Sequence, residues 1–120
     1  MKEDPKKEGM LYLGLDNSLL ISIDDGVHWM PLKNNLPPAP IYWLEVQENY
    51  DDLVVSTYGR GYYILDDLSA LRQFNPALKE APQVFDPRKS YRLNNKESIK
   101  TDGYSFNSGQ NPAYGTPINY

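Results

Sequence analysis

Six short apolar runs, separated by stretches rich in turn-forming residues, are spread over the first 75 positions of the chain. The runs cover residues 10–15, 19–23, 29–32, 41–47, 53–58 and 62–65. They are four to seven residues long and rich in β-branched and aromatic side chains, which is the composition of strands. Asp, Asn and Gly, which favour tight turns, stand between most of them. The pattern therefore predicts an all-β chain of short strands, the first three in meander order.

Three segments depart from this pattern. Residues 1–8 are mostly charged and contain Pro5, so we expect a charged lead-in loop. Residues 33–40 carry three prolines, which fix φ and restrict the residue before them, and we expect an irregular crossing segment there. Residues 66–74 begin with two aspartates and suit one or two helical turns, with the acidic side chains near the positive end of the helix.

The two halves of the apolar region resemble each other. A strand, a turn, a second strand and an Asp-Asp pair follow one another in both halves. Leu11 and Leu53 are 42 residues apart, and so are Asp24 and Asp66. A period of that length is expected of four-stranded propeller blades. The alternative is two unrelated hairpins of similar composition.

Residues 76–120 have a different character. Residues 84–87 and 90–93 are candidates for one or two short strands, whereas the segment from Asn94 onward is rich in Asn, Ser, Gly, Pro and Tyr, with little apolar periodicity. We therefore divide the chain into a lead-in at 1–8, about two four-stranded propeller blades at 9–75, and a coil-rich C-terminal extension at 76–120.

One motif is more specific than the strand pattern. Residues 22–29 contain Ser22, Asp24, Gly26 and Trp29 in the spacing Ser-x-Asp-x-Gly-x-x-Trp. Asp can accept hydrogen bonds from backbone N–H groups just ahead of it, and Gly tolerates a positive φ. Trp can cover such a turn with a large apolar ring. We expect Asp24 to accept backbone hydrogen bonds within the turn, with Trp29 largely buried beside it.

This motif resembles the Asp-box, or BNR repeat, of sialidases, sortilin-type receptors and other β-propeller proteins. Residues 35–41 and 52–72 are also similar to the end of the propeller in large bacterial proteins described as BNR-repeat or sortilin-like glycosyl hydrolases. Residues 109–120 resemble the segment that links such a propeller to a following β-sandwich. The resemblance implies the C-terminal blades of a larger propeller, extracytoplasmic residence (periplasmic or secreted), and a structural role for the Asp-box away from any catalytic centre.

Composition and charge exclude several classes of function. The formal net charge is −4 and no basic cluster is present, so we expect no nucleic-acid partner. The chain has no cysteine, which excludes disulfides and thiolate metal sites within it. No apolar run is long enough to span a bilayer, and the charged start has no signal peptide. We expect neither a cofactor nor a bound metal.

Carboxylates are the first candidates for chemistry. Glycoside hydrolysis needs two of them across a cleft, and the chain has Asp doublets at 24–25, 51–52 and 66–67. Residues adjacent on a strand point to opposite faces, so a doublet is not itself such a pair. Each doublet also lies at an expected turn or helix start, where Asp is favoured structurally. We expect no catalytic pair that is complete within this chain.

Arg60, preceded by Tyr58 and flanked by two glycines, is the most interesting single candidate for ligand contact. The resemblance to sialidases implies an arginine that could clamp a carboxylate, as part of a site completed by other blades. The alternative is that Arg60 pairs with Asp66 or Asp67 and fixes the turn. His28, the only histidine, lies at a variable position of the Asp-box and should be exposed.

The aromatic residues leave two alternatives open. Tyr42, Trp43, Tyr58, Tyr62 and Tyr63 could stack on a sugar, or they could belong to ordinary half-buried strands. We expect a non-catalytic structural or interaction fragment, with a piece of a glycoside hydrolase, sialidase-like or glucanase-like, as the alternative.

Two blades cannot close a ring, so we expect open apolar strands. The candidates for inner strands without neighbours are residues 10–15 and 53–58. The expected partners are the remaining blades or further copies of the chain, with a carbohydrate or protein ligand as a further candidate. Residues 104–120 could act as a strap over part of the exposed surface.

Overall fold

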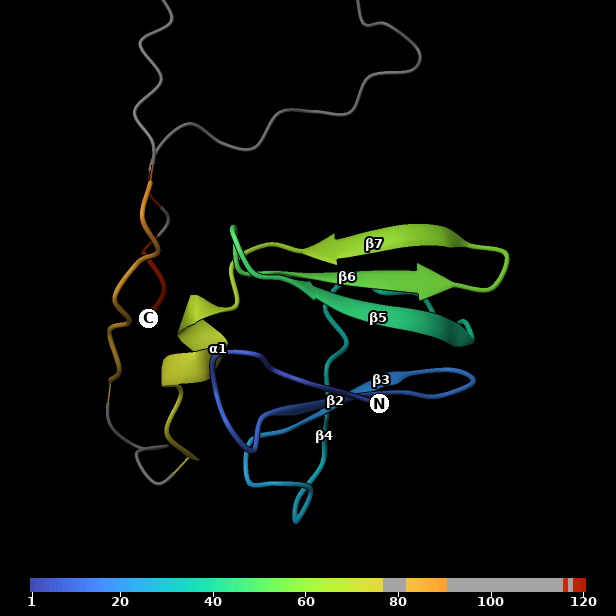
Figure 1. Ribbon diagram of the computed structural model, residues 1–120, viewed down its shortest axis with the longest axis horizontal. Helices are drawn as coiled ribbons and strands as arrows, with labels where there is room; N and C mark the ends of the chain where they lie inside the picture. The colour runs from blue at the N-terminus through green and yellow to red at the C-terminus, as the bar shows by residue number, and fades with distance from the viewer. Residues whose placement is uncertain (77–81, 91–115, 117) are drawn as a thin grey trace, which may run out of the picture.

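The computed structural model describes residues 1–76, 82–90, 116 and 118–120. Its regular elements are β1 (Lys2–Glu3), β2 (Leu11–Gly14), β3 (Leu19–Ser22), β4 (Met30–Pro31), β5 (Ile41–Gln47), β6 (Asp52–Thr57), β7 (Gly61–Leu65) and α1 (Ser69–Gln73). The described chain is therefore mostly β, with two antiparallel sheets and one short helix (Figure 1), as the hydrophobic pattern predicts.

The first sheet has four strands in the order β1-β2-β3-β4, and β2, β3 and β4 form the expected meander. Pro31 lies in the edge strand β4, where its missing N–H breaks no ladder. The return strand begins at Met30 rather than at Trp29. The expectation of a plain loop at 1–8 misses β1, because Lys2 and Glu3 are charged and pair with β2 through the backbone alone.

The second sheet has three strands in the order β5-β6-β7. The first sheet reaches four only with β1 from the lead-in, so residues 9–75 do not form the two four-stranded units expected of them. Strand β6 lies between β5 and β7, and β2 likewise has a neighbour on each side. The expectation that 10–15 and 53–58 lack neighbours is therefore wrong. The edge strands of the second sheet are β5 and β7.

The core lies between the inner faces of the two sheets. Its buried residues come alternately from the strands of both sheets and from the residue before α1: Met10, Tyr12, Leu19, Ile21, Leu44, Val46, Leu53, Val55 and Leu68. The two sheets are in close contact at Gly14 of β2, where an added Cβ would lie 2.5 Å from Cγ2 of Ile41 in β5. A glycine is needed there because any side chain would overlap the β5 strand.

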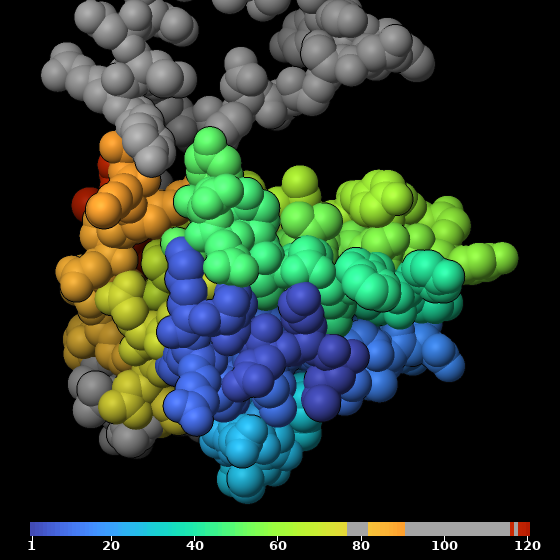
Figure 2. All heavy atoms as spheres, viewed as in Figure 1, coloured from blue at the N-terminus to red at the C-terminus, as the bar shows by residue number. Residues whose placement is uncertain are grey.

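Helix α1 lies at one end of both sheets (Figure 1). It has the short length predicted for 66–74, and the Asp67 carboxylate accepts a hydrogen bond from the backbone N–H of Ser69 at 3.1 Å. Figure 2 shows the N-terminal residues in dark blue packed against the second sheet in green and against α1 in yellow. The lead-in therefore belongs to the folded body of the protein.

The two hairpins also end alike in their backbone conformation. Asp25 and Asp67, 42 residues apart, both have positive φ, at 57° and 63°. Asp is among the few residues other than glycine that adopt this conformation readily. The sequence echo thus extends to the local geometry after β3 and after β7.

Within the extension, the described residues 82–90 contain no strand, and Phe85 donates a backbone hydrogen bond to the carbonyl of Asn119 at 3.2 Å. The expected strand at 90–93 and most of the expected strap at 104–120 lie outside the described residues. Of the strap's described end, Tyr120 is almost fully exposed.

Candidate functional site

The Asp-box turn has the hydrogen bonds expected of its sequence. Asp24 Oδ1 accepts a hydrogen bond from the backbone N–H of His28 at 2.8 Å. The Ser22 hydroxyl donates to the same oxygen at 2.8 Å and accepts from the N–H of Gly26 at 2.9 Å. The prediction for Asp24 is therefore confirmed. Ser22 is fully buried and connects the carboxylate to the turn.

Trp29 is only half-buried, so the prediction of a largely buried ring is wrong. A Cβ built on Gly26 would lie 3.6 Å from Trp29 Cζ2 and from Leu11 Cδ1, which shows that the ring lies against the turn. The ring is not fully covered, since β4, which begins at the next residue, is the edge of the sheet. The ring thus covers the turn from outside the core.

The carboxylate of Asp24 also contacts a second group, the imidazole of His28, which is exposed as expected. Its Oδ2 lies 2.6 Å from His28 Nδ1. The backbone N–H of His28 and then its ring lower the pKa of Asp24 to about 2, with a further contribution from Ser22, and together they outweigh the opposing effect of desolvation. Asp24 is therefore a turn-stabilising carboxylate, and its oxygens point into the turn and not into a cleft.

Arg60 and Tyr58 lie at the turn between β6 and β7, and both are exposed. No ion pair joins Arg60 to another described residue. The expected pairing with Asp66 or Asp67 is absent because those residues follow β7, at the opposite end of the strand. Arg60 thus presents a free guanidinium group at one end of the second sheet.

The other Asp doublets do not form a carboxylate pair across a cleft. Asp52 Oδ1 accepts from Arg88 at 2.9 Å and from the backbone N–H of Asp67 at 3.0 Å. Asp67 in turn accepts from the first residue of α1. These carboxylates hold the turn between β5 and β6 to the segment between β7 and α1, which is a structural role.

An ion-pair network that the sequence analysis did not foresee joins three distant segments. The Asp4 side chain is 0% exposed and that of Arg72 is 11% exposed, with Arg72 Nε 3.0 Å from Asp4 Oδ1. Arg72 Nη1 also binds Asp51, and Lys6 Nζ lies 2.6 Å from the same Asp51 oxygen. The Tyr12 hydroxyl donates to Asp4 Oδ2 at 3.0 Å. The network fastens the N-terminal loop, the β5–β6 turn and α1 to one another.

The ionisation of these groups follows from their contacts. Burial raises the pKa of Asp4, but hydrogen bonds from Arg72, from the N–H of Lys6 and from Tyr12 outweigh it and hold the pKa below the ordinary 3.8. Burial also raises the pKa of Asp51, and Lys6 and Arg72 again reverse the effect. Burial and the neighbouring Asp4 both raise the pKa of Tyr12 well above 10.0. Asp4, Asp51 and Arg72 are therefore charged, and Tyr12 neutral, near neutral pH.

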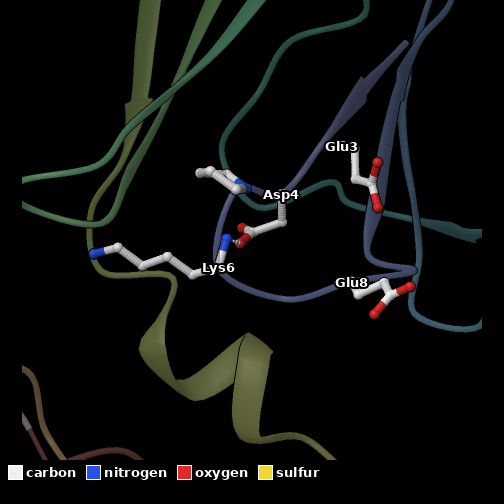
Figure 3. Close-up of a pocket in the computed structure, with 5 residues that line it drawn as sticks. Glu3, Asp4, Lys6 and Glu8 are labelled. Carbon is white, nitrogen blue, oxygen red and sulfur yellow. Dashed lines mark hydrogen bonds between the residues drawn. The ribbon is translucent and has the colours of Figure 1, made fainter.

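Two hollows lie among the described residues, and one of them adjoins the ion-pair network. The larger, about 500 Å³, is lined by Glu3, Asp4, Pro5, Lys6 and Glu8. In Figure 3 the Asp4 carboxylate faces the backbone nitrogen of Lys6, and the Lys6 ammonium group points away from it. The hollow lacks the apolar lining of a small-molecule site. The smaller, about 30 Å³, lies between residues 32–36 and β7 and has room for little more than a water molecule or two.

Metal binding and membrane insertion receive no support from the described part of the chain. No group of three or more His, Asp or Glu side chains gathers there as metal ligands. The described helix, α1, has neither the length nor the hydropathy of a membrane span.

The outer face of the second sheet is largely apolar, with Ser56 and Glu45 as the polar members of two cross-strand rows. Trp43, Ser56 and Tyr62 are cross-strand neighbours on it, and the next row contains Glu45, Val54 and Ile64. Trp43 is 64% exposed, Tyr62 78% and Ile64 60%, and Tyr42 and Tyr58 are exposed at the same end. At about 200 Å² per side chain, the four exposed aromatics present roughly 600 Å². That is the upper limit of the largest apolar patch on a typical monomer.

The first sheet also has an apolar outer face. Leu13, Leu20 and Pro31 form a row across β2, β3 and β4, with the two leucines only half-buried. Both sheets therefore bury one apolar face in the common core and present a second one outward. Strands that are apolar on both faces are typical of sheets covered on both sides.

Sequence reasoning found the Asp-box turn but missed the buried ion pair, because Asp4 and Arg72 are 68 residues apart. One weak signal was present: an Asp just before Pro5 in an otherwise exposed loop suits a side chain that accepts local backbone hydrogen bonds. Nothing in the sequence indicates which cation Asp4 meets.

No protein-family model matches the chain, and no curated protein or solved structure was found to match it.

Proposed function

We propose that this chain is a non-catalytic structural and interaction module, made of blades of an extracytoplasmic bacterial β-propeller protein of the BNR or Asp-box type. The observation that carries the proposal is that both stacked sheets have apolar outer faces, including the exposed Trp43, Tyr62 and Ile64. In a propeller, each blade covers both of its faces with neighbouring blades. Further sheets stacked on these faces would remove the exposed apolar area from water, at about 25 cal/mol per Å².

Two further observations support the propeller part of the proposal. The hairpins β2–β3 and β6–β7 recur at an offset of about 42 residues, which also separates Asp25 from Asp67, both in the left-handed conformation. The Asp-box turn is held by Ser22 and Asp24 on an outer hairpin, away from both hollows. Both features are expected of a propeller blade with a structural role and no catalytic role.

Single-cysteine labelling tests this proposal cleanly, because the natural chain has no cysteine. We would place one cysteine at Val54 or Leu20, on the two outer faces, and a control cysteine at Asn17 in the exposed β2–β3 turn. In the protein as its own cells make it, the Val54 and Leu20 positions should react with a thiol reagent far more slowly than the Asn17 position. Equal reactivity at all three positions in the folded protein would refute covered faces.

The alternative, a contribution to a glycoside hydrolase, depends on the free guanidinium of Arg60. It predicts turnover of sialosides or β-glucans that is lost in Arg60→Ala. We expect no turnover by the 120-residue chain, since Asp24 and Asp52 serve in turns and Asp4 and Asp51 in ion pairs. Hydrolysis that disappears in Arg60→Ala would overturn the non-catalytic proposal.

A further inference from the structure

Strand β7 is an open edge of unusual composition. It is the last strand of the second sheet, whereas the first sheet has a fourth strand at the corresponding place. Among the described residues, no backbone hydrogen bond joins β7 to any segment except β6. Proteins usually protect such edges with lysine, proline or a bulge. The β7 sequence, Gly-Tyr-Tyr-Ile-Leu, contains no charge and no proline.

The charges at the two ends of β7 are opposite in sign. Arg60 directly precedes the strand and Asp66 directly follows it. Both are exposed, and neither forms an ion pair with another described residue. A strand with one free cation and one free anion at its ends is complementary to an antiparallel copy of itself.

We propose that β7 pairs antiparallel with β7 of a second copy of this chain, about a two-fold axis at Tyr63, to give a continuous six-stranded sheet. In this register Arg60 of each copy lies beside Asp66 of the other, so two ion pairs form. Tyr62 lies opposite Ile64 of the other copy on the outer face, an aromatic–β-branched pair of the kind that stabilises antiparallel strands. A two-fold interface uses the same patch on both copies.

Other pairing registers of the two β7 strands lose the ion pairs or mismatch the side-chain faces. A shift of two residues would leave both side-chain faces matched but would separate Arg60 from Asp66. A shift of one residue would place the outer-facing Tyr62 and Ile64 opposite inner-facing residues. Parallel pairing would place Arg60 beside Arg60. The observed faces and charges therefore select one antiparallel register, in which the backbone supplies the hydrogen bonds of added-strand recognition.

This proposal rests on the interaction role proposed above and names its partner, a second copy. Its test is sedimentation velocity of the 120-residue chain over a range of micromolar concentrations. We expect a reversible dimer. Arg60→Glu and Asp66→Lys should each weaken the dimer about 10-fold or more, because two attractive pairs become repulsive in each symmetric dimer. Lys89→Glu, an equal charge reversal at an exposed residue outside the strand, is the matched control.

Mixing the two variants gives the sharpest result. A mixed dimer of Arg60→Glu with Asp66→Lys restores two opposite-charge pairs, so the mixture should dimerise about as tightly as the natural chain. Circular dichroism would first establish that each variant is folded. A monomer at all concentrations, equal weakening by Lys89→Glu, or no recovery on mixing would overturn the proposal. The cysteine labelling at Val54 and Leu20 tests the proposed function separately. If the chain stays monomeric but labelling at these positions is slow, the dimer proposal fails and the proposed function still holds.

Discussion

Replacing Arg72 by methionine should be the most destabilising single change in the ion-pair network. The substitution leaves the Asp4 carboxylate fully buried without its cation, and removing one partner of a buried pair costs about 3–5 kcal/mol. Asp4 keeps hydrogen bonds from the backbone N–H groups of Lys6 and Lys7 and from Tyr12, which places the expected loss at the lower end, about 3 kcal/mol. The more exposed Asp51 adds little, since solvent screens it.

Urea denaturation measures this loss as a lower midpoint at an unchanged slope. Arg88→Met is the matched control, because Arg88 also pairs with an aspartate but its side chain is 29% exposed. It should cost no more than about 1 kcal/mol. The double variant Asp4→Asn/Arg72→Met removes the buried charge together with its partner and should recover much of the loss. If Arg72→Met cost no more than Arg88→Met, or if the double variant recovered nothing, the interpretation of Asp4 as a buried, Arg-dependent charge would be refuted.

The remaining predictions concern pH, the Asp-box turn and the contact between the sheets. Folding lowers the pKa values of Asp4 and Asp51, so these carboxylates stabilise the fold fully above pH 3.8 and lose that stabilisation as the pH falls through their folded-state pKa values. Thermal melts should show this loss of stability in acid, and Arg72→Met should make the loss smaller. The pKa of Tyr12 is raised in the folded state, so its contribution to stability is retained below pH 10.0 and falls as the pH rises further. Tyr12→Phe should remove this loss of stability in alkali, and an unchanged alkaline profile in the variant would contradict the prediction. Asp24→Ala should lower the melting temperature and keep the secondary structure, because the N–H of His28 and the hydroxyl of Ser22 lose their acceptor. An unchanged melting temperature would show that the turn does not need the carboxylate. Gly14→Ala should cost about 1–3 kcal/mol in urea denaturation because its Cβ would overlap Ile41, and a neutral result would show that the sheets can separate slightly without loss.

The sequence predicts the strands that are long and apolar, and it fails where backbone pairing or distant contacts decide the structure. Residues 41–47 are a strand as expected, because their apolar side chains alternate and their partners are close in sequence. The short strand β1 is invisible to such a pattern, since Lys2 and Glu3 are charged and pair with β2 through the backbone.

The candidate site shows the same division. The hydrogen bonds of Ser22 and Asp24 are local, so residue type and spacing suffice to predict them. The half-buried state of Trp29 depends on whether another strand follows β4 in the sheet, which no local pattern reports. The contact of Asp4 with Arg72 depends on where α1 docks, and that is fixed only when both sheets have assembled.

We propose that the second sheet is a contact surface, and residue-resolved amide hydrogen exchange tests that most directly. The measurement would compare β7 with β6 and with the exposed β2–β3 turn at Asp16–Ser18, in the protein as its own cells make it. If the edge and the outer face are engaged, every amide from Gly61 to Leu65 should exchange about as slowly as those of β6. If alternate β7 amides, those that point away from β6, exchange as fast as the turn in the assembled protein, the second sheet is free and its role as a contact surface is contradicted.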